Sequence, residues 1–227
     1  MADAYSRRFD RALVLAALVH EGVPRKGTVV PYVIHPVHVA AILLKYGYGE
    51  GLVTAALLHD VLEDIEYDNG RLQLAIRSAF PGAGLPDRIM GGSRYREQFT
   101  AFLSREFDDD VLALVRAVTE PKNAGGPLRS WADRKQDTLS HLESADDDVL
   151  ALKAADALHN VRSILEDIEH HGAEVLNRFN AAPSEVLWYF GRVSALVRER
   201  LGSAPIADEL ERATEEFARF VGTIASP

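Results

Sequence analysis

Hydrophobic and polar residues follow a helical period over most of this 227-residue chain. Apolar residues recur three or four positions apart, and no stretch shows the sustained alternation typical of a half-buried strand. Gly and Pro interrupt the period at short intervals and mark helix ends. The pattern therefore predicts a predominantly α-helical fold. Helices are expected over residues 6–21, 36–47, 50 to about 66–69, 71–80, 111–119, 146–170, 184–201 and 206–221, with one more starting at residue 130.

One domain over residues 1–227 is the predicted organisation, because the chain can form one sizeable core and shows no fixed-period repeat or low-complexity tail. Residues 183–223 are predicted to be C-terminal helices packed on this core. Residues 82–110 are predicted to be an insertion carrying a surface helix, and a lid over a substrate is the alternative. The Gly-rich stretch 123–127 is predicted to be a flexible connector.

Charge and cysteine content limit the classes of partner. The formal net charge is −9, so no global basic field is available to hold a nucleic acid polymer, although a small nucleotide needs only a metal and a few local bases. The chain has no cysteine, which excludes disulfides and thiolate metal sites and fits a reducing compartment. Any metal must therefore be held by nitrogen and oxygen ligands.

The apolar run at residues 12–19 follows several arginines and superficially resembles a signal peptide. It leads into His20 and Glu21 without a small-residue cleavage pattern, so we predict a buried helix instead. No apolar run approaches the roughly 20 residues that a membrane span needs. We expect a soluble, cytoplasmic protein with no membrane partner. The sequence gives no indication of whether the protein is a monomer or an oligomer.

The most informative stretch is residues 55–64, an apolar helical run that ends with His59, Asp60, Glu63 and Asp64. A buried imidazole beside an unpaired carboxylate is costly unless something cationic satisfies both, which a divalent metal would do. Residues three and four apart share a helix face, so Glu63 and Asp64 border whatever His59 and Asp60 hold. The alternative is a helix end running into solvent, with His59 a satisfied core histidine.

Two further residues favour the metal interpretation. His35 stands beside Pro36, where His35 is predicted as the cap and Pro36 as the first residue of a helix. Asp156 lies among alanines and leucines on a helical period. Together with His59 and Asp60 they offer two imidazoles and two carboxylates, a set that suits a borderline to hard divalent ion. The chain has, in order, a histidine, a His-Asp pair and a distant aspartate. In this order it resembles the HD-domain metal-dependent phosphohydrolases.

Within that superfamily, four segments taken in order resemble the hydrolase domain of the Rel/SpoT alarmone enzymes and the small single-domain alarmone hydrolases. The segments are residues 25–26, 31–36, 59–64 and 156–163. The loop at 27–30 and the segment at 82–110 depart from the family pattern. The resemblance implies an HD-type helical bundle and removal of the 3′-pyrophosphate from guanosine tetra- or pentaphosphate, with Mn(II) as the usual metal.

The resemblance also assigns roles to residues. The metal ligands would be His35, His59, Asp60 and Asp156, and Glu63 and Asp64 would orient the attacking water or move its proton. By resemblance and position, the substrate-binding residues would be Arg25, Lys26, Tyr32, Asn160 and Arg162. The family also has an Arg-Lys pair where this chain has Arg134 and Lys135, which adds two candidate phosphate contacts.

Two other functions remain open from the sequence. Because the two departing segments weaken the assignment of a substrate, the chain could be an HD phosphohydrolase for another nucleotide or for NADPH. It could also be a nucleotide-binding module without turnover. A binding module would have no need of Glu63 and Asp64, which weighs against the second alternative.

Overall fold

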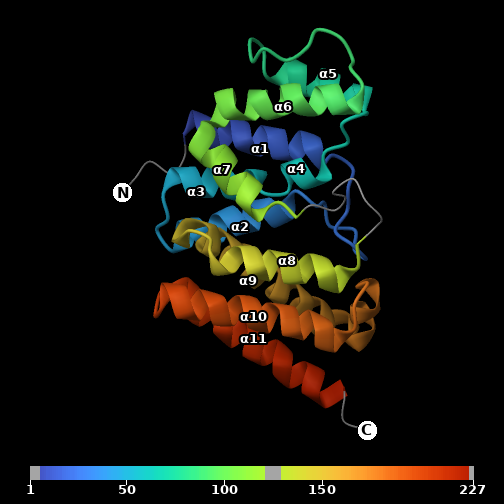
Figure 1. Ribbon diagram of the computed structural model, residues 1–227. Helices are drawn as coiled ribbons and strands as arrows, with labels where there is room; N and C mark the ends of the chain where they lie inside the picture. The colour runs from blue at the N-terminus through green and yellow to red at the C-terminus, as the bar shows by residue number, and fades with distance from the viewer. Residues whose placement is uncertain (1–5, 121–128, 225–227) are drawn as a thin grey trace. The chain divides into compact units, whose positions relative to one another are not determined.

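The computed structural model describes residues 6–120 and 129–224, so the predicted connector at 123–127 lies outside the described residues. Within these ranges the regular elements are eleven α-helices and one 3-10 helix (Figure 1). The only pairing of extended backbone there is an isolated β-bridge between Pro24 and Pro31. The prediction of an all-α fold is therefore confirmed.

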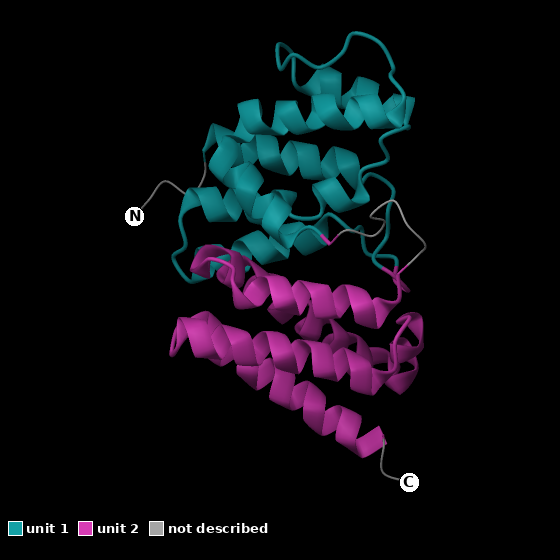
Figure 2. Ribbon diagram, in the orientation of Figure 1, with its two compact units in different colours: residues 1–25, 29–119 teal, residues 26–28, 120–227 magenta. Residues whose placement is uncertain are grey.

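The chain folds as two compact units (Figure 2). The first unit comprises residues 1–25 and 29–119, and the second comprises residues 26–28 and 120–227. The prediction of one domain over the whole chain stays a prediction, as does that of residues 183–223 packing on a shared core. No helix in the described part of the chain is both long and apolar enough to cross a membrane.

Helix α3 (Glu50–Leu58) forms the centre of the first unit. Every residue from 52 to 58 is buried, as expected for a helix that is apolar all round. It packs against α1 (Arg7–Val19), α2 (Ile34–Lys45) and α7 (Asp109–Val118). His59 directly follows this buried helix, and His35 lies on α2, which packs against it.

Helix α1 is the buried helix predicted from the apolar run at 12–19. The Ser6 hydroxyl caps it by accepting hydrogen bonds from the N–H groups of Arg8 and Phe9. One face buries Ala12, Leu15, Ala16 and Val19, and it packs against α3.

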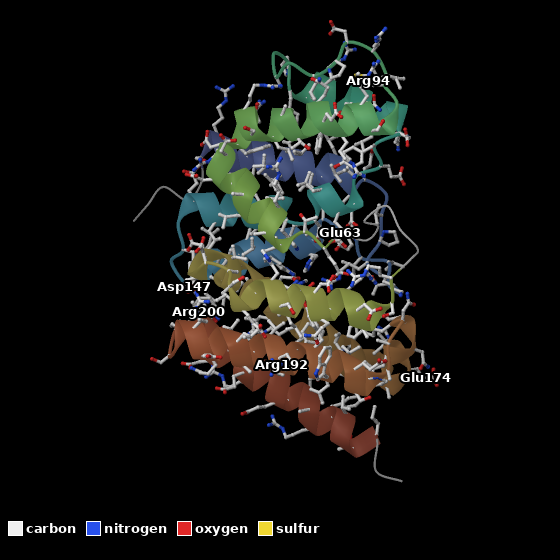
Figure 3. All side chains as sticks on the ribbon, viewed as in Figure 1. Glu63, Arg94, Asp147, Glu174, Arg192 and Arg200 are labelled. Atoms are coloured by element: carbon white, nitrogen blue, oxygen red, sulfur yellow. The ribbon has the colours of Figure 1, made fainter. Side chains whose placement is uncertain are left out.

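The 82–110 segment contains a surface helix, α6 (Gly92–Phe107), which packs against α1 and α7. Its inner face buries four aromatic side chains, and its outer face carries exposed residues such as Arg94 (Figure 3). Helix α5 (Gly70–Ala79) precedes it and also packs against α1. The four buried aromatic residues of α6 are Tyr95, Phe99, Phe102 and Phe107. The description of residues 82–110 as an insertion stays a prediction.

In the second unit, three long helices pack against one another: α9 (Asp147–His171), α10 (Pro183–Leu201) and α11 (Pro205–Ile224). Helix α8 (Trp131–Glu143) packs on α10, and the 3-10 helix η1 (Ala173–Arg178) follows α9. The helix expected to start at residue 130 has a side-chain cap, because the Ser130 hydroxyl accepts a hydrogen bond from the N–H of Asp133.

A polar contact ties the end of α10 to the start of α9. The Arg200 guanidinium donates to Asp147 Oδ1 at 2.8 Å and to the Ala145 carbonyl oxygen at 3.1 Å (Figure 3). The acidic start of α9 therefore has a structural explanation and needs no catalytic one.

Two local predictions near the candidate site were wrong. Helix α2 begins at Ile34, so His35 and Pro36 lie in its first turn and His35 is not its cap. A proline is tolerated there because the first-turn N–H groups have no partner within the helix.

The predicted continuous helix through residues 50–66 is divided into α3 and the short α4 (Val61–Asp64). Asp60 separates them with φ −93° and ψ −6°, a backbone conformation common at turns and active sites. In addition, the Ala56 carbonyl, which would bond the N–H of residue 60 in a continuing helix, contacts the His59 ring.

Candidate metal centre

His35 and His59 meet side by side inside the first unit. Their exposed fractions are 3% and 4%, and their Nε2 atoms are 3.2 Å apart. Metal–nitrogen bonds of about 2.1 Å at right angles would place two ligand nitrogens about 3.0 Å apart. The pair is thus spaced as two neighbouring ligands of one ion would be.

The local backbone sets the tautomer of His59. Its Nδ1 lies 2.7 Å from the Ala56 carbonyl oxygen, an acceptor, so we assign the ring proton to Nδ1. The Nε2 lone pair is then directed at His35. A histidine that ligates a metal usually donates its other N–H to such a carbonyl or to a carboxylate. His59 therefore fits a metal ligand in both position and tautomer.

Asp60 brings a carboxylate to the two imidazoles. Its Oδ2 lies 3.2 Å from His59 Nε2 and 3.7 Å from His35 Nε2. The Tyr32 hydroxyl donates to the same oxygen at 2.7 Å, and the Tyr32 ring meets the His35 ring edge-on with centroids 5.7 Å apart. Tyr32, expected from the sequence to bind substrate, is in contact with a candidate metal ligand.

The two remaining acids lie on α4, one turn beyond Asp60, and both are half-buried. Glu63 is labelled in Figure 3. Asp64 Oδ2 lies 3.9 Å from Nδ1 of His20, the residue that ends α1. The structure thus brings together the six first-unit residues of the predicted site that lie between 32 and 64: Tyr32, His35, His59, Asp60, Glu63 and Asp64.

In the second unit, Asp156 lies near the middle of α9 and is 9% exposed. Asn160, one turn later, donates from Nδ2 to Asp156 Oδ1 at 2.6 Å, which confirms that the two residues share a helix face. Lys153 Nζ donates to Asp156 Oδ2 at 2.7 Å. Burial, the largest single influence, would lower the pKa of Lys153, but the charges of Asp156 and Tyr189 and their hydrogen bonds to Lys153 together outweigh it, so the pKa is raised well above its usual value. Both carboxylate oxygens of Asp156 therefore accept a hydrogen bond from the same helix.

The predicted phosphate-binding bases have different surroundings. Arg25 is half-buried in the first unit, and the exposed Lys26 donates from Nζ to Asn180 Oδ1 at 3.2 Å in the second. Arg162 is exposed and forms an ion pair with Glu209 of α11.

Arg134 and Lys135 both contact the carboxylate of Glu120, each at 2.5 Å. Lys135 Nζ also lies 4.9 Å from the centroid of the Tyr189 ring. Both bases are only partly exposed, so neither is a fully solvated surface charge.

Sequence reasoning missed His20 as a site residue. It is 2% exposed, its ring lies 4.8 Å from that of Tyr32, and its closest carboxylate contact is with Asp64. The signal was available, because His20 follows Ala12 and Ala16 at four-residue intervals and so continues the buried face of α1.

The sequence and the fold of this chain are similar to those of known proteins. The sequence model of the HD domain family matches residues 32–161. The GTP pyrophosphokinase of Streptomyces coelicolor is 30% identical over 158 residues, which are 70% of this chain and 15% of that protein. The guanosine-3′,5′-bis(diphosphate) 3′-pyrophosphohydrolase of Borreliella burgdorferi is 27% identical over 170 residues, 71% of this chain and 20% of that protein. The chain thus spans a fifth or less of the length of these curated relatives.

Two solved structures resemble the fold. The structure of lmo0812 from Listeria monocytogenes EGD-e has a TM-score of 0.59 and 26% identity, covering 80% of this chain and 96% of that one. A metazoan ortholog of SpoT that hydrolyses ppGpp has a TM-score of 0.62 and 24% identity, covering 96% of this chain and 97% of that one. The second likeness shows the fold alone.

Proposed function

This chain belongs to the HD domain family, and on that premise we propose that it is a metal-dependent phosphohydrolase that removes the 3′-pyrophosphate of guanosine tetra- or pentaphosphate. One observation carries the proposal: two buried histidines present Nε2 atoms 3.2 Å apart, beside the carboxylate of Asp60. The name of the Borreliella burgdorferi relative supports the choice of substrate.

The proposed metal ligands are His35, His59, Asp60 and Asp156. The first three are neighbours in the first unit, and Asp156 is included because the region matched by the family runs from residue 32 to residue 161. Two nitrogens and two carboxylate oxygens suit a borderline to hard divalent ion, and the resemblance to the alarmone hydrolases favours Mn(II). Two carboxylates also balance the formal charge of a dication.

The bound metal would lower the pKa of a water molecule toward neutrality and neutralise charge on a phosphoryl oxygen. Glu63 and Asp64 then have a separate task, because neither is needed as a ligand. They lie one turn beyond Asp60, where a carboxylate can accept the proton of the attacking water and hold that water in line with phosphorus.

Five residues were predicted to bind substrate, and they fall into two groups: residues that contact a proposed metal ligand, and basic residues. Tyr32 and Asn160 contact Asp60 and Asp156, so we propose that they orient the carboxylates of the metal site. Arg25 and Lys26 remain the proposed phosphate contacts.

Arg162 would have to break its ion pair with Glu209 before it could contact a phosphate. Arg134 and Lys135 would likewise have to give up Glu120. Each of these three bases thus forms an ion pair with a carboxylate in the structure.

The proposal is tested by comparing two histidine variants with the wild type. His59→Ala removes a proposed ligand, whereas His38→Ala removes an exposed histidine of α2 and serves as the control. Wild type and His38→Ala should each retain about one divalent ion per chain and hydrolyse ppGpp when Mn(II) is supplied. His59→Ala should lose both. Equal metal content in all three proteins would contradict the proposed metal site.

A further inference from the structure

His20 is a buried histidine without an evident partner for its ring. It ends α1, is 2% exposed, and neither ring nitrogen has a hydrogen-bond partner among the residues that the structure describes. Leaving a buried polar group without a hydrogen bond is energetically costly. Such groups are rare in native proteins and indicate an unrecorded partner or a functional role.

The surroundings of His20 identify the missing partner. Nδ1 lies 3.9 Å from Asp64 Oδ2, and the ring is tilted 41° from that of Tyr32 with centroids 4.8 Å apart. Burial, the largest influence, lowers the pKa of His20, and together with the nearby His59 and His35 it outweighs the opposing influence of the Asp60 and Asp64 charges. The ring is therefore neutral near pH 7 and offers one N–H donor, for which the Asp64 carboxylate is the adjacent acceptor.

We infer that His20 is a positioning residue for Asp64, with Nδ1–H donating a hydrogen bond to Asp64 Oδ2 in the metal-loaded site. The inference rests on the proposed function, in which Asp64 handles the attacking water. The observed separation exceeds a normal N–H···O hydrogen bond by about 1 Å. Catalytic hydrogen bonds are often long without substrate and shorten in the reactive complex.

This arrangement matches a common pattern in enzyme active sites, in which one residue orients the general base. A general base works best when a third group fixes its orientation, as in a nucleophile, base and orienting residue acting together. Here the water is the nucleophile, Asp64 the base and His20 the orienting group. The ring of His20 also contacts Tyr32, whose hydroxyl binds Asp60. One side chain of α1 therefore contacts both a residue that orients a ligand and a proposed base.

A purely structural role would require only the shape of the ring. An apolar side chain would pack against Tyr32 without burying two unsatisfied nitrogens. If His20 orients Asp64, a substitute side chain that carries a hydrogen-bond donor should restore kcat; if His20 only fills space, it should not. A pair of substitutions can therefore separate the two explanations.

The test compares His20→Leu, which keeps bulk and removes the donor, with His20→Asn, whose amide places a donor near the position of Nδ1. His20→Leu should lower kcat for ppGpp by about 10–100-fold, the range seen when an orienting partner is lost, with KM and Mn(II) content unchanged. His20→Asn should recover most of that loss. Tyr95→Phe is the control, because Tyr95 is another buried group of the first unit, and its hydroxyl has no hydrogen-bond partner within residues 6–120 and 129–224.

Equal losses of kcat in His20→Leu and His20→Asn, or no loss in either, would overturn the inference. A second measurement does not depend on turnover. The imidazole ¹⁵N resonances of the Mg(II)-loaded chain, assigned with His20→Leu, should show Nδ1 protonated and should shift in Asp64→Ala. A ring protonated at Nε2 and insensitive to Asp64→Ala would overturn the inference. If the wild type leaves ppGpp intact, the proposed function fails, while these resonances still decide the contact between His20 and Asp64.

Discussion

Replacing Tyr32 with phenylalanine tests whether this residue serves the metal or the substrate. The sequence predicted a substrate contact, whereas the hydroxyl donates to Asp60 Oδ2 at 2.7 Å. Tyr32→Phe removes that hydrogen bond and keeps the ring, which contacts His20 and His35 with centroid separations of 4.8 Å and 5.7 Å. The variant therefore isolates the hydroxyl.

The size of the effect follows from the charge of the acceptor. A hydrogen bond to an ionised group contributes about 1.5–3 kcal/mol. Each 1.4 kcal/mol corresponds to a tenfold change in an equilibrium constant, so metal affinity should fall by about 10–100-fold. Loss of a side chain that orients a metal ligand has an effect of the same size.

The assay is calorimetric titration of the metal-free protein with Mn(II), for wild type, Tyr32→Phe and the control Tyr95→Phe. Tyr95→Phe also removes a buried hydroxyl, but one with no recorded hydrogen bond. Only Tyr32→Phe should bind Mn(II) more weakly, and KM for ppGpp at saturating Mn(II) should change little. Unchanged Mn(II) affinity together with a raised KM would refute the reasoning and return Tyr32 to the substrate-binding set.

Three other predictions concern single side chains. Glu63→Gln should lower turnover by about 10²–10⁴-fold if the carboxylate handles a proton, while Mn(II) and nucleotide binding survive; a wild type that binds nucleotide without turnover would favour a binding module. Lys153→Met should lower the free energy of unfolding of the metal-free protein by about 3–5 kcal/mol in urea, because it removes the ammonium partner of the buried Asp156 carboxylate; a loss under 1 kcal/mol would contradict the structure. Burial raises the pKa of Tyr95 to about 12, so the unfolded chain loses this proton first as pH rises through 10. The wild type should therefore lose about 1.4 kcal/mol relative to Tyr95→Phe between pH 8 and pH 11, and parallel stability curves would refute this.

Contacts within one helix could be predicted from the sequence. The spacing of Asp156 and Asn160 places them on one face, and their side chains are hydrogen-bonded. The apolar run at 12–19 predicted a buried helix, and α1 is one. In such cases the helical period alone determines which residues are neighbours.

Contacts between helices could not be predicted in the same way. Nothing near Tyr32 in the sequence indicates that its hydroxyl reaches Asp60, and nothing near Arg162 indicates Glu209. The division of the 50–66 helix also escaped prediction, because residues 59–64 continue a helical pattern. It depends on Asp60 adopting a turn conformation and on the His59 ring contacting the Ala56 carbonyl.

Identifying the products released from ppGpp tests the central claim most directly. The metal-free chain would be supplied with Mn(II) and offered ppGpp, NADPH, deoxynucleotides and mononucleotides in separate reactions, and each released fragment would be identified. We predict pyrophosphate and the corresponding guanosine 5′-diphosphate from ppGpp, with no release before Mn(II) is added. Inorganic phosphate from NADPH or a mononucleotide, with ppGpp untouched, would contradict the account.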